Sequence, residues 1–100
     1  MSRTDARRVL VAYDIPLDSR RLAIAKVLQR YGDRVQYSVF IVDAHPAKLQ
    51  RLRFELEDTM ELAEDSILIC DLGLLKPAIE NRFEWLGQRR HLTQNRSVIV

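Results

Sequence analysis

The chain of 100 residues contains one cysteine, three prolines and three glycines, and it has no long apolar run. A lone cysteine excludes an internal disulfide and a cluster of four thiolates. Because Cys70 lies inside the apolar run "SILICDL", we expect a small buried hydrophobic residue with no redox role. No segment approaches the roughly 20 apolar residues of a membrane-spanning helix, and the N-terminus lacks the apolar core of a signal peptide. We therefore expect a cytoplasmic protein.

Several motifs that carry chemistry are also missing. The sequence has no glycine-rich phosphate loop, no zinc-ligand spacing, and no nucleophile paired with a base as in hydrolases. His45 and His91 stand alone, so we expect the first to cap a helix and the second to lie in a loop. No strand of the Gly-Phe-x-Phe kind is present, which argues against an RNA-recognition module.

The composition is that of an ordinary soluble globular protein, with 47% apolar and 30% charged residues. One hundred residues suffice for one domain with one core. The charge is divided unevenly, because residues 1–53 contain 11 Lys and Arg against 5 Asp, whereas residues 54–100 contain 5 Lys and Arg against 9 acids. The basic half suits the phosphate backbone of a nucleic acid, or it serves only as a solvated surface.

Three segments have the composition of strands. Residues 8–14 are apolar at nearly every position, as in a strand covered on both faces. Residues 34–44, "RVQYSVFIVDA", predict either one long strand or two strands joined near Tyr37 and Ser38, since no Asn-Gly turn decides between them. A further apolar strand is expected at residues 66–72.

Two segments have the periodicity of amphipathic helices. Asp18 and Ser19 can cap a helix that Gly32 ends, and Pro46 suits the first turn of a second helix. Both contain apolar residues at spacings of three and four, which is typical of a buried helical stripe. The stripes are Ile24, Val27, Leu28 and Tyr31 in the first helix, and Leu49, Leu52, Leu56 and Met60 in the second.

This order of elements fits a ferredoxin-like α+β sandwich, an antiparallel sheet with two helices on one face. We expect residues 1–100 to form this single domain, with residues 73–100 as a C-terminal extension whose last residues, "SVIV", form an edge strand or a swapped strand. Because the strands are apolar on both faces, a second copy of the sheet is the simplest cover for the bare face. Burial of several hundred Å² per chain would contribute on the order of 10 kcal/mol, so the sequence predicts a two-fold homodimer.

Asp14 ends the first predicted strand, in the stretch "VLVAYDIP". One carboxylate is a poor site for a hard cation, but two copies that meet at a symmetry axis could hold one Mg²⁺ with water ligands. Alternatively, the Asp14 side chain bonds to the backbone of the following turn, which Pro16 favours. Both interpretations are open from the spacing alone.

The stretches "VAYDIP" and "YGDRVQYSVFIVD", with the pair Arg20 and Arg21 between them, closely resemble the CRISPR-associated endoribonuclease family, the small dimeric partner of the CRISPR integrase. The resemblance spans about Val9 to Leu72. It implies a ferredoxin-like homodimer in antiviral defence, a metal-dependent nuclease, and binding to DNA or RNA in spacer acquisition. Many members have an acid where Ile41 stands, and some have an arginine where Ala23 stands.

The resemblance also implies which residues act. Asp14 matches the catalytic and Mg²⁺-binding position. Positions implicated in activity or nucleic-acid contact match Tyr13, Arg20, Arg21, Arg34 and Phe40.

Each of these five residues has a simpler interpretation beside the functional one. Tyr13 and Phe40 at strand positions could be core or interface packing, and Arg34 a solvated strand end. Arg20 and Arg21 lie in the first turn of a helix, where the dipole disfavours cations unless an anion binds there.

Three classes of function follow. The first is a Mg²⁺-dependent endonuclease, and the second is a nucleic-acid-binding partner of the integrase subunits that does not cleave. One protein can be both, and we rank the integrase partner first with the nuclease activity attached to it. The alternative is a non-catalytic ferredoxin-like domain that binds single-stranded RNA or a small molecule.

Overall fold

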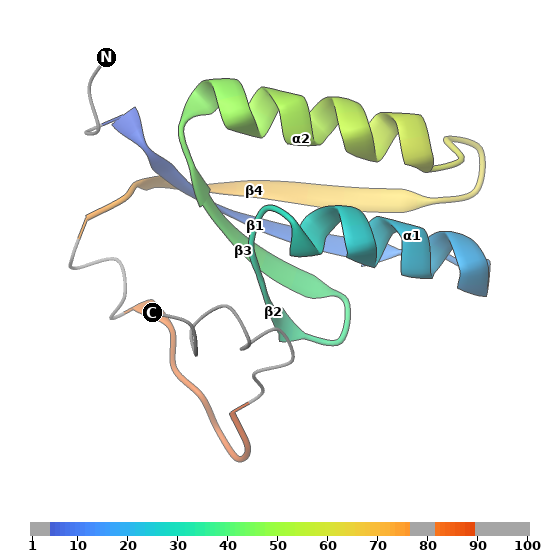
Figure 1. Cartoon of the computed structure of the whole chain (residues 1–100). Helices are drawn as coiled ribbons and strands as arrows, with labels where there is room; N and C mark the ends of the chain where they lie inside the picture. The colour runs from blue at the N-terminus through green and yellow to red at the C-terminus, as the bar shows by residue number, and fades with distance from the viewer. Residues whose placement is uncertain (1–4, 77–81, 90–100) are drawn as a thin grey trace.

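The chain folds into a four-stranded antiparallel sheet with two helices on one face, as Figure 1 shows. The structure is a computed structural model that describes residues 5–76 and 82–89. The strand order is β2-β3-β1-β4, so β1 is paired with both β3 and β4. This arrangement confirms the predicted ferredoxin-like α+β sandwich. The elements are β1 (Arg7–Asp14), α1 (Asp18–Gln29), β2 (Asp33–Gln36), β3 (Val39–Ala44), α2 (Pro46–Thr59) and β4 (Ser66–Leu74).

The segment that the sequence left open is two strands. Gln36 of β2 pairs with Val39 of β3, so Tyr37 and Ser38 form the turn between them. Neither residue has a positive φ, which explains why no glycine or asparagine is needed here. The backbone N–H of Tyr13 donates to the carbonyl of Ser38 at 3.0 Å. The turn is therefore joined to the last residues of β1.

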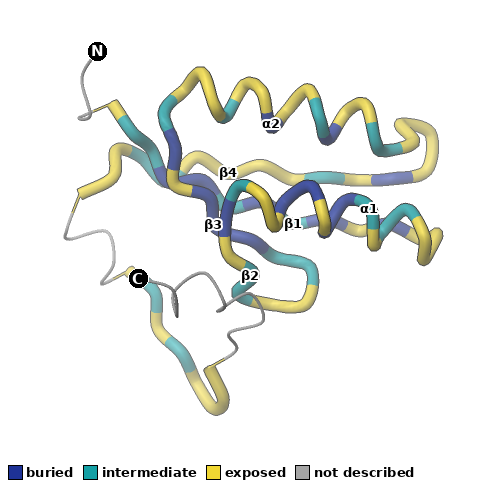
Figure 2. The backbone as a smooth tube through the Cα atoms, in the orientation of Figure 1, coloured by how far each residue is buried: buried dark blue, intermediate teal, exposed yellow. Residues whose placement is uncertain are grey.

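Both predicted helices are present, and each packs its apolar stripe against the core. The predicted caps of α1 are wrong, because the helix begins at Asp18 itself, with Leu17 at the N-cap position and no capping side chain. The residues nearest the sheet are buried along both helices, which Figure 2 shows in dark blue. His45 occupies the N-cap position of α2, but its side chain makes no capping bond and its Nδ1 instead lies 2.5 Å from Asp5. The core consists of Val9, Val11, Tyr13, Ile15, Ile24, Ala25, Val27, Leu28, Phe40, Val42, Ala44, Leu52 and Leu56.

Gly32, between α1 and β2, is required by close packing. A Cβ at this position would lie 2.1 Å from the carbonyl oxygen of Ile41 and 2.8 Å from the Val42 side chain. Any side chain would therefore push β3 away from the end of α1. This contact explains why a glycine follows the first helix.

The face of the sheet opposite the helices carries a patch of apolar residues. Val9, Val11 and Tyr13 point into the core, so the alternate residues of β1 point to the opposite face. Cross-strand pairing aligns the apolar residues of this face in two rows. We call them the open-face patch: Ile41, Leu10 and Cys70 in one row, and Val39, Ala12 and Leu68 in the other.

The exposure of β4 corrects one expectation. Cys70 is exposed in the single chain rather than buried, and Leu68 beside it is 61% exposed. The expectation is wrong for the single chain because β4 is an edge strand with no buried residue, and even Ile69, opposite the core residue Val11, is 38% exposed.

The C-terminal part begins later than predicted, because β4 continues to Leu74. In the described part of this extension, the ring of Phe83 lies 5.5 Å from the guanidinium of Arg8. Arg8 also pairs with Asp43 across the sheet at 2.8 Å, so these residues bound one end of the open-face patch. The predicted "SVIV" strand lies outside the described residues. None of the helices in residues 5–76 or 82–89 has the length and apolar character needed to cross a membrane.

Candidate functional site

Asp14 lies at the last position of β1, opposite Ser66 of β4, and its side chain is exposed. By the alternation of the strand it shares a face with Leu10 and Ala12, so it stands at the edge of the open-face patch. No hydrogen bond or ion pair joins its carboxylate to another residue within the described ranges. The bond to the following turn, which the sequence allowed, is therefore not formed there, and the carboxylate is accessible.

Three of the residues implied by the resemblance, one each from β1, β2 and β3, contact one another in the sheet. The rings of Tyr13 and Phe40 lie 6.3 Å apart between centroids, and the Arg34 guanidinium lies 5.2 Å from the Phe40 ring. Arg34 Nη2 also donates to the Tyr13 hydroxyl at 3.4 Å. Because Tyr13 is 6% exposed and Phe40 is 0% exposed, these rings are core packing in the single chain.

The Tyr13 hydroxyl links this packing to the surface. It lies 3.4 Å from the carbonyl oxygen of Tyr37, to which it can donate. The Tyr37 side chain itself is 68% exposed. The sequence predicted that Tyr37 lies in a strand or at the junction of two strands, and it did not indicate that the side chain is exposed.

Arg21 hydrogen-bonds to the backbone of the loop that follows Asp14. Its guanidinium donates to the carbonyl of Ile15 at 3.0 Å and to that of Pro16 at 3.3 Å, and it pairs with Asp18 at 2.8 Å. The pKa of Arg21 is raised, first by the hydrogen bond to Asp18 and to a lesser degree by the Tyr37 hydroxyl. The side chain remains 28% exposed, so a positive charge is held against the loop that follows Asp14.

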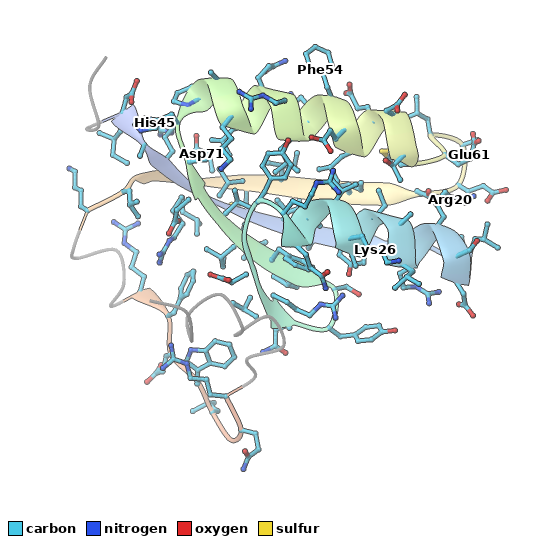
Figure 3. The ribbon with its side chains drawn as sticks, in the orientation of Figure 1. Arg20, Lys26, His45, Phe54, Glu61 and Asp71 are labelled. Atoms are coloured by element: carbon cyan, nitrogen blue, oxygen red, sulfur yellow. The ribbon has the colours of Figure 1, made fainter. Side chains whose placement is uncertain are left out.

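Arg20 has a different position. It donates to Asp65 at 2.5 and 3.0 Å and to Glu64 at 2.8 Å, and the Asp65 side chain is 0% exposed. Asp65 also accepts from the backbone N–H of Glu61, at the end of the molecule where Figure 3 shows Arg20 and Glu61. The Arg20 guanidinium lowers the pKa of Asp65. Arg20 therefore joins the start of α1 to the loop before β4 through ion pairs.

The sequence could not indicate this pair, because the two residues are 45 positions apart and neither belongs to a recognisable motif. The two adjacent arginines therefore differ in what they can offer a ligand. Arg21 is partly exposed over the loop after Asp14, whereas Arg20 is held by Asp65 and Glu64.

A metal site is not complete in one chain. Within residues 5–76 and 82–89, no three His, Cys, Asp or Glu side chains are close enough together to hold a metal ion. Asp14 alone does not fit Mg²⁺, which takes near-octahedral oxygen coordination. The assignment of Mg²⁺ to Asp14 stays a prediction that depends on a second carboxylate.

The fold and this strand-end site define a ferredoxin-like α+β protein with an accessible carboxylate at the end of β1, followed by a loop that an arginine of α1 contacts. Residues 7–74 match the family described as CRISPR associated protein Cas2. The chain belongs to this family, as the motifs of its sequence predicted.

Relatives and solved structures agree with this assignment. The chain is 43% identical over 64 residues to a CRISPR-associated endoribonuclease Cas2 of Synechocystis, covering 64% of this chain and 70% of the relative. It is 41% identical over 63 residues to a CRISPR-associated endonuclease Cas2 of Thermus thermophilus, covering 63% of this chain and 70% of the relative. The Streptococcus pyogenes Cas2 structure superposes with a TM-score of 0.69 at 33% identity, covering 80% of this chain and 99% of that one.

Proposed function

We propose that this protein is a CRISPR adaptation protein that acts as a homodimer, binds nucleic acid beside the integrase subunits, and cleaves phosphodiester bonds with Mg²⁺. The observation that carries the proposal is the position of Asp14, an accessible carboxylate at the edge of an apolar sheet face. The names of the relatives, endoribonuclease and endonuclease, support the same class of activity.

The homodimer is supported by the open-face patch. Its residues are contiguous across three strands, and Leu68 at its β4 edge is 61% exposed. Two-fold stacking of two such patches removes apolar surface from water on both chains at once. Because Asp14 borders the patch, a two-fold axis at that end of the patch would place the two Asp14 carboxylates opposite each other.

The paired Asp14 carboxylates, with water ligands, are the residues that would hold Mg²⁺. When bound, Mg²⁺ polarises a phosphate oxygen and activates a water for attack. Arg21 supplies positive charge for a neighbouring phosphate, and its bonds to the Ile15 and Pro16 carbonyls keep the loop in place. Arg20 contributes by holding α1 against the loop before β4.

The Asp14→Ala variant tests this function, with Asp58→Ala on the exposed side of α2 as the matched control. Cleavage of RNA and of DNA is measured with and without Mg²⁺, and duplex binding is measured over a salt series. We expect Asp14→Ala to lower cleavage at least about a hundredfold, because the carboxylate contacts the metal, while duplex binding and the control keep wild-type values.

Two results would contradict parts of the proposal. Equal cleavage by Asp14→Ala and the wild type removes Asp14 from the mechanism. No cleavage by the wild type, together with steep salt dependence of duplex binding, leaves the integrase partner and removes the nuclease.

A further inference from the structure

We infer that Arg20 and Asp65 are positioning residues of the cleavage site, because their ion pair closes a short ring of residues that holds the backbone of Asp14 in place. The inference rests on the proposed function and adds two residues that do not touch the substrate. It begins from the Asp65 carboxylate, which is 0% exposed and has no part in the proposed reaction. The start of α1 and the loop between α2 and β4 lie at the same end of the molecule, as Figure 1 shows.

Within the described residues, the backbone of Asp14 is paired with one strand only. The register pairs between β1 and β3 end at Ala12, and one further backbone bond comes from Tyr13. Pairing of β1 with β4 continues to the last residue of β1, where Asp14 lies opposite Ser66. The place of Asp14 in the sheet is therefore set by the first residue of β4.

Packing alone holds the start of β4 weakly. β4 is an edge strand in which every residue is exposed or half-buried, and Ser66 itself is exposed. Ile67 is the residue of β4 that packs against the core. The end of a strand opens readily where few apolar contacts are buried. An anchor next to Ser66 is therefore needed to keep its pair with Asp14 closed.

Asp65, the residue before Ser66, provides this anchor. Its carboxylate accepts from Arg20 Nε at 2.5 Å and Nη2 at 3.0 Å, and from the backbone N–H of Glu61 at 2.8 Å. Two bonds from the planar guanidinium fix direction as well as distance. A buried ion pair adds little net stability compared with apolar packing of the same volume, because desolvation offsets the attraction. Directional bonds are what apolar packing in this place would not supply.

The ring closes through the first turn of α1. The chain runs from Asp14 through the loop to Arg20, the ion pair crosses to Asp65, and the next residue, Ser66, leads back to Asp14 by strand pairing. Arg21 bonds to two carbonyls of the loop within this ring. Breaking the ion pair would therefore release the start of β4 and leave Asp14 without a fixed strand partner. A displacement of about 1 Å at a reacting group can lower a rate by about a hundredfold.

Glu64→Gln is the control for charge. Arg20 also donates to Glu64 at 2.8 Å, and the Glu64 side chain is 59% exposed. Glu64→Gln and Asp65→Asn each remove one negative charge next to Arg20, so they alter the attraction of nucleic acid alike. Only Asp65→Asn opens the ring. A difference between the two variants therefore reports the ring and not the charge.

Glu55→Gln is the control for stability. Glu55 accepts bonds from Arg30 and from the Tyr31 hydroxyl, and these bonds join the end of α1 to α2. They lie at the opposite end of α1 from Asp14. Arg20→Lys tests the direction of the bonds, since lysine keeps the charge but cannot donate from a planar fork.

The experiment measures steady-state cleavage of the RNA or DNA oligonucleotide that the wild type cleaves faster, and backbone amide exchange, both below the lowest melting temperature of the set. Asp65→Asn should lower kcat by about ten- to a hundredfold and keep the KM of Glu64→Gln, because the acting carboxylate is displaced while the binding charges remain. Amide exchange in peptides that cover residues 13–17 and 65–68 should be at least about tenfold faster. Arg20→Lys should fall between Asp65→Asn and the wild type. Glu64→Gln and Glu55→Gln should keep the wild-type kcat and the wild-type exchange in these peptides.

Three results would overturn the inference: wild-type kcat in Asp65→Asn, an equal fall of kcat in either control, or unchanged exchange at residues 13–17 in Asp65→Asn. Amide exchange needs neither metal nor substrate, so it is independent of the cleavage test. If Asp14→Ala abolishes cleavage while Asp65→Asn cleaves like the wild type, the proposed function stands and this inference fails. If the wild type does not cleave but Asp65→Asn speeds exchange at residues 13–17, the ion pair holds Asp14 in place and the proposed nuclease fails.

Discussion

At the scale of single residues, Arg20 and Arg21 show how adjacent side chains of one type take different roles. Successive residues of a helix point about 100° apart, so the two guanidiniums reach different surroundings. Arg20 meets a carboxylate that is fully buried, and Arg21 meets the carbonyls of an exposed loop. A buried Asp65 without its cation would keep its desolvation cost and lose its partner.

The Arg20→Ala variant should therefore lower the melting temperature more than Arg21→Ala does. Arg21→Ala should instead reduce the slope of log binding constant against log salt by about 1, which is the loss of one phosphate contact. Thermal melts of the two variants measure the change in melting temperature, and salt titrations of nucleic-acid binding measure the change in slope. The assignment of roles is wrong if Arg20→Ala alone changes the salt slope.

The same ion pair predicts a pH dependence. The pKa of Asp65 is lowered in the folded chain, chiefly by the Arg20 hydrogen bond, so the folded state binds its proton less readily than the unfolded state does. The resulting stabilisation is complete above the unfolded pKa of about 3.9 and is lost as the pH falls through the folded value. Melts of the wild type and Asp65→Asn should differ most near neutral pH and converge in acid. A constant difference across this range would contradict the role of the ion pair.

At the scale of elements, the helices could be predicted from the sequence and the hairpin could not. Apolar spacings of three and four residues defined both helices, because the period of a helix is a local property. The hairpin had no such local signal, since its turn contains Tyr37 and Ser38 and neither needs a positive φ. Pairing with β1 through the Ser38 carbonyl decides where that turn lies.

The junction of α1 and β2 offers a test at this scale. Gly32→Ala would place a methyl group 2.1 Å from the Ile41 carbonyl oxygen, so β3 must shift. We expect a loss of about 1–3 kcal/mol in the free energy of unfolding, which is typical of overpacking. Urea unfolding at a fixed protein concentration measures it, because the stability of the proposed dimer would depend on concentration.

Gly73→Ala provides the comparison, because nothing lies within 4 Å of its added Cβ and its φ of +105° is the source of strain. Its cost should come from the backbone, so it should not disturb the packing of β3. If Gly32→Ala unfolds at the wild-type urea concentration, the close approach to Ile41 is not a constraint on the fold.

At the scale of the whole molecule, the two faces of the sheet have different surroundings. The helices cover one face, and the open-face patch lies on the other, bounded by Arg8 with Asp43 at one end and by Asp14 at the other. This arrangement makes a second chain the natural cover. It also makes the proposed metal site depend on assembly, because one chain contributes one carboxylate.

The Leu68→Glu variant should convert the dimer to a monomer, because it places a charge within the patch where a partner would exclude water. Leu62→Glu is the matched control, since Leu62 is 74% exposed in the loop between α2 and β4. Sedimentation equilibrium of the three proteins gives the answer, and Leu68→Glu should also lose Mg²⁺-dependent cleavage. The stacked-sheet arrangement is excluded if the wild type is a monomer, or if both variants remain dimeric.

The amino-acid sequence by itself determined the type and order of the elements apart from the β2–β3 hairpin, the apolar stripes of both helices, and the position of Asp14 at the end of a strand. These are local properties, set by the period of side chains along the backbone and by strong formers and breakers of each element. Tertiary structure alone decided the partner of Arg20, the exposure of Cys70 and the joining of the turn at Tyr37 and Ser38 to β1. Each depends on which residues distant in the sequence lie side by side across the sheet and helices, which is set by the packing of the whole chain.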